Sequence, residues 1–275
     1  MSNQSAGGSK ADRRDAARER ALAIQKEQER REKRSRLIVL ISVIAGVVVV
    51  ALLAFFILNQ QKQPVDPNVT SFPADVDVPS TADASGGFTL FKGEAVTTQP
   101  EGVPVVDLYL DFMCPHCADF EALNSGWLLD KADAGEMAYR VHPIAILGSP
   151  HSVTIGAAFA SLLETDPELG MKFGAAAFAA QNTGGLNEAT MRSMMSDIGV
   201  PSADIDKAVS GKYERFIQAA SNITLNNESL RDNEGRFGTP ALFLNGKRWD
   251  VNWTQVDEFK AALADAAPAS GPIGD

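Results

Sequence analysis

A pair of cysteines separated by two residues constrains this chain more than any other feature. Cys114 and Cys117 are its only cysteines, so neither has another disulfide partner within the chain. The apolar-rich run 105–112 before them is typical of a strand, and the residues after them carry apolar side chains at helical spacing. Two thiols at the junction of a strand and a helix suit reversible disulfide chemistry. A purely structural disulfide is a weaker interpretation, because so short a loop constrains the unfolded chain little.

The residues around Cys114 favour a reactive thiolate, which is the nucleophilic form of cysteine. Cys114 is expected at the first helical turn, where free backbone N–H groups stabilise negative charge by about 0.3–1 kcal/mol. Pro115 is tolerated there, because the N–H at that position has no partner within a helix. His116 brings a ring that can donate to the sulfur or, when protonated, attract it. A stabilised thiolate is also a good leaving group, so the disulfide form should be a ready oxidant.

A run of twenty-two uncharged residues, 37–58, is long enough to cross a membrane. As a helix it would span roughly 33 Å, which matches a hydrocarbon core of about 30 Å. Basic residues crowd its N-terminal side between Arg30 and Arg36, whereas only Lys62 lies close on the other side. The positive-inside rule therefore predicts a single-pass protein of the plasma membrane, with a cytoplasmic N-terminus and residues 59–275 outside. Disulfides persist in that oxidising space.

A cleaved signal peptide is the alternative to a retained anchor. The apolar region of a signal peptide is usually about 7–15 residues long and is followed by small residues at the cleavage site. Here the run is longer, and Asn59-Gln60-Gln61-Lys62 follows it without such a pattern. We therefore predict a retained transmembrane helix.

Composition divides the chain into four parts. Residues 1–36 form a charged cytoplasmic tail of about +5, the apolar run 37–58 follows, and residues 59–85 are predicted to be a Pro-rich extracytoplasmic linker. Residues 86–275 are predicted to form one globular domain. Everything after the membrane span carries a net charge of about −15. That charge argues against nucleic-acid binding, which requires cations to neutralise phosphates.

Within the globular domain, hydrophobic periodicity and turn residues predict an α/β sheet with helices packed on it. Strands are expected at 88–91, 103–111, 137–147, 241–244 and around 248–251. Helices are expected from the cysteine motif to about residue 130, through a helical block at about 151–230, and at 254–263. The long helical block separates the third strand from the last two.

The motif Asp111-Phe112-Met113-Cys114-Pro115-His116-Cys117 resembles that of the DsbA-like thiol–disulfide oxidoreductases of the thioredoxin superfamily. The long helical block and Gly238-Thr239-Pro240 before the final hairpin share the resemblance, which spans roughly residues 86–266. It implies a thioredoxin-like fold with a large helical insertion. It also implies no cofactor other than the redox-active disulfide.

The resemblance further implies a role for the residues of the site. Cys114 would be the exposed nucleophile that forms mixed disulfides, and Cys117 would be the buried thiol that resolves them. Thr239 and Pro240 would form a cis-proline loop that presents backbone to the substrate. Reduced or unfolded exported proteins are the expected substrates. A membrane oxidase of the DsbB-like or VKOR-like kind would regenerate the disulfide.

Proton transfer from Cys117 has no assigned acceptor. Many relatives carry a buried acid six positions before the first cysteine, where this chain has Leu108. Asp107 and Asp111 have the opposite strand parity and are expected to face away. Water is the alternative acceptor.

Other polar side chains of the domain are expected to be structural or solvated. His142 follows a strand-like run and is expected to be a structural polar residue. Asp119 and Glu121 lie in the helix after the motif and are expected to be solvated. None of these three is predicted to take part in the reaction.

Other functions stay open at this point. The same fold could run as a reductase or isomerase under a different redox partner. A binding protein could use the two cysteines and His116 to hold a soft metal such as Cu(I) or Zn(II), although a closed zinc site needs four ligands and no second C-x-x-C motif supplies them. A scaffold with incidental cysteines is the third alternative. We predict the disulfide-donating oxidoreductase and assign no metal.

Overall fold

The computed structural model describes residues 66–181 and 186–269. The predicted tail 1–36 and membrane span 37–58 lie outside these ranges, as does the start of the predicted linker. Among the described residues, no helix combines the length and the apolar character that a membrane crossing requires.

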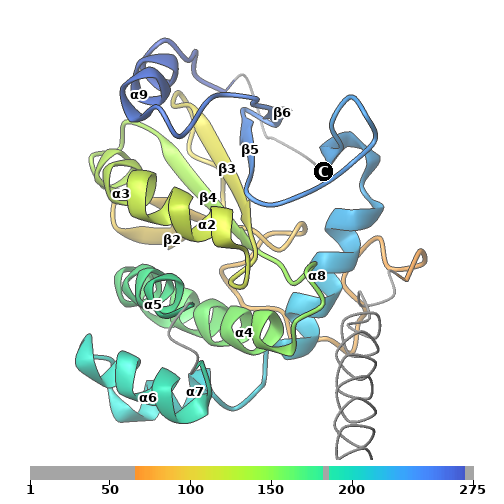
Figure 1. The fold of residues 1–275 in the computed structure, drawn as a ribbon, viewed down its shortest axis with the longest axis vertical. Coiled ribbons are helices and arrows are strands. Elements are labelled where there is room, and N and C mark those ends of the chain that lie inside the picture. Colours follow the sequence, from red (N-terminus) through yellow and green to blue (C-terminus); the bar gives the residue numbers. More distant parts are fainter. Residues whose placement is uncertain (1–65, 182–185, 270–275) are drawn as a thin grey trace, which may run out of the picture. The chain divides into compact units, whose positions relative to one another are not determined.

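The domain is built around a six-stranded sheet with the strand order β2-β1-β4-β3-β5-β6 (Figure 1). Its strands are β1 (Phe88–Phe91), β2 (Glu94–Val96), β3 (Val105–Leu110), β4 (Ala138–Pro143), β5 (Ala241–Leu244) and β6 (Lys247–Arg248). β3 pairs in parallel with β4 and antiparallel with β5. Every residue of β3 is buried, because neighbours cover both its edges and both its faces. The strand that leads to the cysteines is therefore enclosed in the middle of the sheet.

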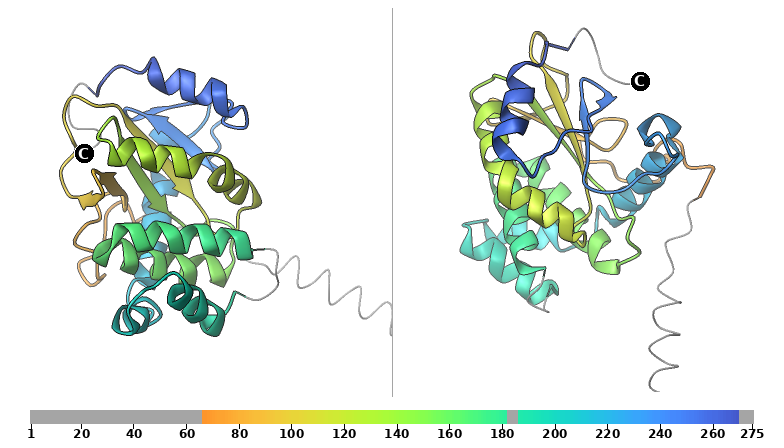
Figure 2. Two further views of the ribbon diagram at one scale, coloured as in Figure 1. Left: turned by 90° about the vertical axis from the view of Figure 1, so that its left-hand side faces the viewer. Right: turned by 45° about the horizontal axis from the view of Figure 1, so that its top comes forward.

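Helices follow the cysteine motif and fill the connection between β4 and β5. After the motif come α2 (Pro115–Phe120), a π-helical segment (Glu121–Ser125) and α3 (Gly126–Asp133). The insertion contains α4 (Pro150–Thr165), α5 (Pro167–Ala180), α6 (Glu188–Asp197), α7 (Ser202–Ala208), α8 (Glu214–Asn226) and a 3-10 turn (Glu228–Leu230). After β6 comes α9 (Val256–Ala264). Figure 2 shows α4 to α7 gathered as a helical layer beside the sheet, and contacts of α4 with α5 and α7 hold this layer together.

Alternate residues of β3 face two different cores. Leu108 and Leu110 point into the main core, which also contains the side chains of α2, α3 and α9. Tyr109 lies on the other face with Phe243 of β5. There its ring also stacks on that of His142 of β4, with centroids 4.0 Å apart. The sheet is thus covered on both faces.

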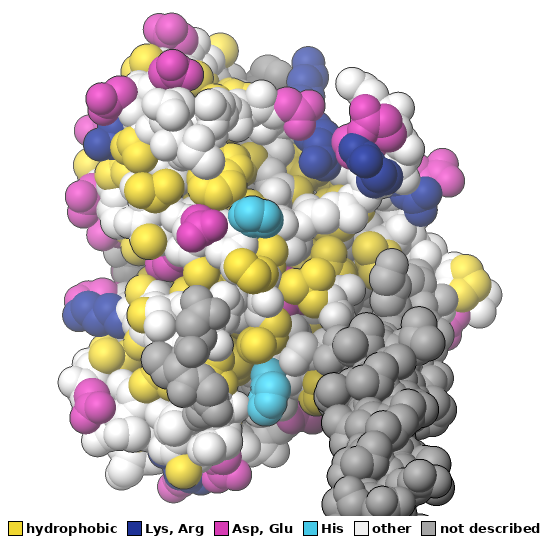
Figure 3. Space-filling view, in the orientation of Figure 1, with side chains coloured by type: hydrophobic (Ala, Val, Ile, Leu, Met, Phe, Trp, Pro, Cys, Tyr) yellow, Lys and Arg dark blue, Asp and Glu magenta, His cyan; other side chains and the backbone are white. Residues whose placement is uncertain are grey.

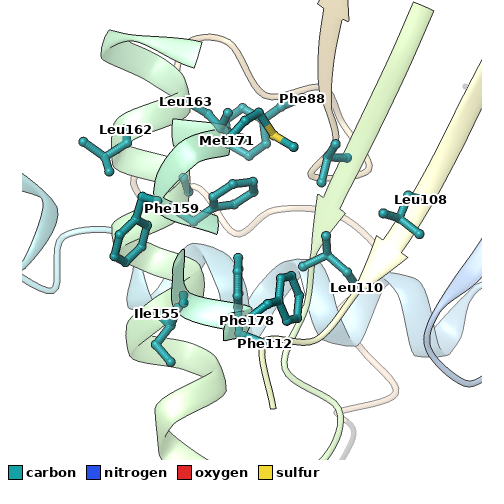
Figure 4. Packing of buried hydrophobic residues seen from close by; sticks show 14 of the residues in the cluster. Phe88, Leu108, Leu110, Phe112, Ile155, Phe159, Leu162, Leu163, Met171 and Phe178 are labelled. Atoms are coloured by element: carbon teal, nitrogen blue, oxygen red, sulfur yellow. The ribbon is translucent and has the colours of Figure 1, made fainter. Parts of the chain in front are cut away.

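Phe112 connects the cysteine motif to the helical insertion. Its fully buried ring packs on Phe159 of α4 and Phe178 of α5, with centroid distances of 5.1 Å and 4.8 Å (Figure 4). Gly174 of α5 permits close packing here, because a Cβ at that position would meet the Phe159 ring at 2.9 Å. The insertion therefore fixes the backbone just before Cys114.

The predicted α/β sheet with a long helical insertion is confirmed. β1 and β5 have the predicted bounds, whereas β3 and β4 are shorter than the apolar runs 103–111 and 137–147. β2 is missing from the predicted elements. It has only 3 residues and none of them is fully buried, so its alternation is too brief to detect.

The prediction that residues 59–85 form a free linker is wrong for residues 66–85, which are the part that the structure describes. From residue 66 onward the segment is attached to the domain. The ring of Phe72 stacks on Phe216 of α8 with centroids 5.1 Å apart, and the Ser80 backbone N–H donates to Glu164 of α4 at 2.8 Å. Its prolines and acidic residues suggest a free tether, but its apolar side chains find partners on the helical insertion.

Candidate active site

A tight turn after β3 delivers Cys114 to the start of α2. The carboxylate of Asp111 accepts a hydrogen bond from the Met113 backbone N–H at 2.8 Å, and the Asp111 carbonyl accepts one from the Cys114 N–H at 2.9 Å. Cys114 is the N-cap of α2, with an extended backbone at φ −85° and ψ 117°. Pro115 follows in the first helical turn, where it breaks no intrahelical hydrogen bond. The sulfur of Cys114 therefore lies at a helix N-terminus, as predicted.

Asp111 is completely buried and hydrogen-bonded from several sides. Besides Met113, its carboxylate accepts hydrogen bonds from the backbone N–H groups of Ile146 and Leu147, at 2.8 Å and 3.1 Å, and from Ser152 Oγ at 2.6 Å. These bonds fasten the cysteine motif to the loop after β4 and to the first turn of α4.

Gln181, which follows α5, also holds the cysteine motif in place through hydrogen bonds. Its Nε2 donates to the backbone carbonyls of Phe112 and Cys114, at 2.7 Å and 3.0 Å. The sequence around Gln181 carries no signal of this role, because the contact to Cys114 joins positions 67 residues apart.

The sulfur of Cys114 faces the loop that carries Thr239 and Pro240. The Thr239–Pro240 peptide bond is cis, which confirms the expectation for this loop. The Cys114 thiol donates to the carbonyl oxygen of Thr239 at 3.2 Å. The predicted exposure of Cys114 is wrong, because this loop lies against it and leaves only 5% of the residue exposed.

The pKa values of the two thiols are shifted in opposite directions. The pKa of Cys114 is lowered to about 6, mainly by a hydrogen bond from the Cys117 thiol. Thr239 and the backbone N–H groups of Cys117 and His116 also lower it, and burial acts in the opposite direction. Burial raises the pKa of Cys117, and the neighbouring Cys114 raises it further. At neutral pH, Cys114 is therefore a thiolate and Cys117 a thiol.

His116 acts on Cys114 through its backbone. Its side chain is 76% exposed, and Nδ1 lies 3.6 Å from Oδ2 of Asp119. The group of His116 that lowers the pKa of Cys114 is its backbone N–H. We expected the ring to contact the sulfur, but it points to solvent because it lies on the outer face of α2.

An apolar hollow adjoins the cysteines beside the cis-proline loop. It is lined by His116, Asp119, Ala122, Leu123, Pro240, Trp253 and Thr254. Leu123 is 45% exposed there, so an apolar partner would find unpaired surface. Figure 3 shows hydrophobic side chains gathered across the face on which Figure 1 places α2. Such a surface suits an extended polypeptide with apolar side chains.

Asp107 lies away from the cysteines, as predicted. It is buried on the face of β3 opposite to that of Leu108, where it pairs with Arg140 and lies 3.2 Å from Nε2 of His142. Asp107 therefore cannot receive the proton of Cys117. His142 has the structural place that the sequence predicted.

Glu121 does not lie where the sequence predicted. It was expected to be solvated, but burial raises its pKa to about 7. Its carboxylate accepts a hydrogen bond from Ser125 Oγ at 2.5 Å. The side chain is half-buried. A glutamate in a helix is usually on the surface, so no local signal marks this one as partly covered.

The described residues offer few side chains that could bind a metal ion. Within residues 66–181 and 186–269, no group of three or more His, Cys, Asp or Glu side chains is placed to hold a metal ion. The sulfurs of Cys114 and Cys117 lie together, but the ring of His116 is turned to solvent.

Comparison with known proteins shows the family of this chain and the structures that share its fold. A family model described as thioredoxin matches residues 92–265. MdbA from Actinomyces oris, a thiol-disulfide oxidoreductase, is 21% identical with a TM-score of 0.57, over 70% of this chain and 91% of that one. MdbA from Corynebacterium diphtheriae is 19% identical with a TM-score of 0.55, over 68% and 96%. DsbA from Mycobacterium tuberculosis is 22% identical with a TM-score of 0.51, over 67% and 95%. No curated protein sequence matches the chain.

Proposed function

Because this chain belongs to the thioredoxin family, we propose that it is a thiol–disulfide oxidoreductase that donates its Cys114–Cys117 disulfide to exported proteins. The observation that carries the proposal is that two cysteines at one helix N-terminus have pKa values shifted in opposite directions. The pKa of Cys114 is lowered to about 6, whereas that of Cys117 is raised. A thiolate this stable is a good leaving group, which favours the transfer of the disulfide to a client.

The transfer takes two exchange steps. A client thiolate attacks Sγ of Cys114 in the disulfide, and Cys117 leaves with the electron pair. A second client thiolate then attacks the client's own sulfur in the mixed disulfide, and Cys114 leaves as the thiolate. The client gains a disulfide, and the enzyme ends with both cysteines reduced.

The hollow beside Pro240 is the proposed binding place for clients. Its apolar lining and the exposed Leu123 would receive side chains that are buried in a folded protein but accessible in an unfolded one. A preference for unfolded chains would follow from this apolar surface. The enzyme would thereby act in oxidative protein folding.

The proposed place of work is the outer side of the plasma membrane. The uncharged run 37–58 would serve as the anchor, with residues 1–36 in the cytoplasm. A membrane oxidase of the DsbB-like or VKOR-like kind would accept electrons from the reduced cysteines. Mixed disulfides trapped on a Cys117→Ala variant in cells would identify clients and oxidase, and an empty trap would contradict both partnerships.

The direct test is oxidation of a reduced, unfolded test protein, together with the reduction potential of the cysteine pair. We expect transfer of the disulfide and a potential close to that of DsbA, about −120 mV, and not to that of thioredoxin, about −270 mV. A potential near the thioredoxin value would make the chain a reductase or isomerase. Failure to oxidise the test protein, with copper or zinc bound in protein purified from its native compartment, would favour the metal-binding alternative.

A further inference from the structure

A groove runs between α5 and the helical segment 115–133, which consists of α2, the π-helical segment and α3. The two elements lie side by side (Figure 2). They run in opposite directions, because Gln181 just after α5 donates a hydrogen bond to the carbonyl of Cys114 just before α2. The groove between them has a volume of about 740 Å³, and Cys114 does not line it. It is therefore a surface distinct from the reacting sulfur.

Rows of small side chains form both walls of this groove. Ala118, Ala122 and Gly126 recur at every fourth residue on one wall, and Ala175 and Ala179 do so on α5. Small residues at this spacing leave room along a helix pair for the protruding side chains of a third helix, which pack as ridges into a groove. Its most buried lining residues are apolar, namely Leu90, Met171 and Phe178.

Gly126 keeps the groove open without being required by the fold of this chain. Its backbone is helical, with φ −57° and ψ −53°, a conformation that any residue adopts. A Cβ at this position would meet nothing within 4 Å beyond the adjoining helical backbone. Glycine is also one of the least favourable residues in a helix. The absence of a side chain here therefore serves the space in the groove and not the packing of the domain.

The groove is strongly acidic. Among its described lining residues, five side chains are acidic and only Lys172 is basic, and Lys172 is already paired with Glu168 at 2.6 Å. Within residues 66–181 and 186–269, Glu121, Asp130 and Asp133 form no ion pair. An apolar surface is thus bordered by acids that lack a cation. The five acids are Asp119, Glu121, Asp130, Asp133 and Glu168.

The charge and shape of the groove decide which kind of partner fits. Nucleic acids and anionic lipid headgroups have the same sign of charge as the groove, so they are repelled. A client in the hollow beside Pro240 meets a different lining, because only Asp119 and Ala122 belong to both surfaces. A helix with one apolar face and basic flanks is complementary to the groove in both shape and charge.

We propose that this groove binds a basic amphipathic helix of a partner protein. Apolar side chains of that helix, spaced at i, i+3 or i+4 and i+7, enter the space between the two rows of small residues. Lys or Arg side chains on its flanks pair with Glu121, Asp130 and Asp133. As a helix, the wall from Ala118 to Asp133 is about 23 Å long, so it accommodates a partner helix of about 15 residues. Binding there does not require the exchange reaction of the cysteines.

The affinity of a designed peptide tests the proposal. The probe is a fluorescent peptide of about 15 residues with leucines on one helical face and lysines on the other. It is titrated against the full chain in phosphatidylcholine nanodiscs, with empty nanodiscs as the blank. We expect saturable binding that weakens as salt is added, because salt screens exposed charges. A peptide of the same composition, with its leucines scattered around the helix, should bind about tenfold more weakly or worse.

Two substitutions, each with a matched control, locate the bound peptide. Gly126→Leu fills the groove where the chain itself leaves space, so it should abolish binding while the domain stays folded. Ala261→Leu adds a leucine at an exposed position of α9 and should bind the peptide as the unmodified chain does. Asp130→Lys should weaken binding about tenfold, because repulsion replaces attraction. Glu258→Lys makes the same change at an exposed position of α9 and should have no effect.

Three results would overturn the proposal. The first is the absence of saturable binding, and the second is equal binding by the unmodified chain and Gly126→Leu. The third is self-association of the chain that Gly126→Leu abolishes, because the groove would then hold a second copy. Oxidation of the unfolded test protein should be unchanged in Gly126→Leu, so failure of the groove and failure of the proposed function are measured separately.

Discussion

Cys114 and Cys117 lie within one helical turn, yet their pKa values move in opposite directions. The hydrogen bond from Cys117 makes the largest contribution to the lowered pKa of Cys114, and Thr239 and the backbone N–H groups of Cys117 and His116 add to it. Cys117 has the opposite surroundings, because it is buried beside a thiolate. One pKa unit corresponds to about 1.4 kcal/mol, so each sulfur fixes the charge state of the other.

Replacing Cys117 with alanine should raise the pKa of Cys114 from about 6 toward its ordinary value of 9.0, because the main hydrogen bond is lost. The ultraviolet absorbance of the thiolate, followed against pH, measures this shift. His116→Ala keeps the backbone N–H, so we expect a smaller rise and a correspondingly smaller loss of oxidising power. A Cys114 pKa that stays near 6 in Cys117→Ala would contradict the assigned cause.

The residues of the site differ in how well their positions and surroundings could be predicted from the sequence. Cys114, Cys117 and the cis bond before Pro240 follow from a motif and a resemblance. Glu121 does not, because its partial burial depends on α5, which only the folded chain brings beside it. The surroundings of a charged side chain are a tertiary property, and helical periodicity alone predicts solvent.

At the scale of elements, the helical insertion stabilises the turn between β3 and α2 that carries Cys114, as the sheet does. Asp111 fastens it to the first turn of α4, and Gln181 fastens it to the end of α5. Phe112 packs between the same two helices. The insertion is therefore a structural support for the site.

Gln181→Ala should loosen the turn that carries Cys114, because two backbone carbonyls lose their side-chain donor. We expect a loss of about 1–2 kcal/mol in the free energy of unfolding. Urea unfolding measures this change, and the reaction of Cys114 with DTNB should slow as well. Gln218→Ala, the same change at an exposed position of α8, is the control and should alter neither. Equal stability of the two variants would show that Gln181 does not support the turn.

Elements with a local signal were predictable from the sequence. β1 and β5 are short apolar runs bounded by turn residues, and the helices of the insertion repeat their apolar positions at helical spacing. β2 and the attached segment after residue 66 lack such signals, because β2 is held by pairing with β1 and Phe72 by the ring of Phe216. Phe216 is far from Phe72 in the sequence, and β2 is an edge strand that is too short to show a pattern of its own.

For the whole molecule, the acidity of Cys114 should make the stability of the reduced protein depend on pH. The pKa of Cys114 is lower in the folded state, so its thiolate stabilises the fold above the ordinary value of 9.0, and this stabilisation is lost as the pH falls through about 6. Relative to reduced Cys114→Ser, the reduced protein should therefore gain stability between pH 6 and 9. Urea unfolding of both proteins across this range is the measurement, and parallel curves would contradict the prediction.

The hollow opens toward Pro240 on one flank of the helical segment after the cysteines, and the groove lined by Gly126 and by Met171 of α5 opens on another flank. A polypeptide seated in the hollow would cover the sulfur of Cys114 and leave the other flank free. The helix that carries the cysteines would then present two surfaces, of which a bound client occupies only one.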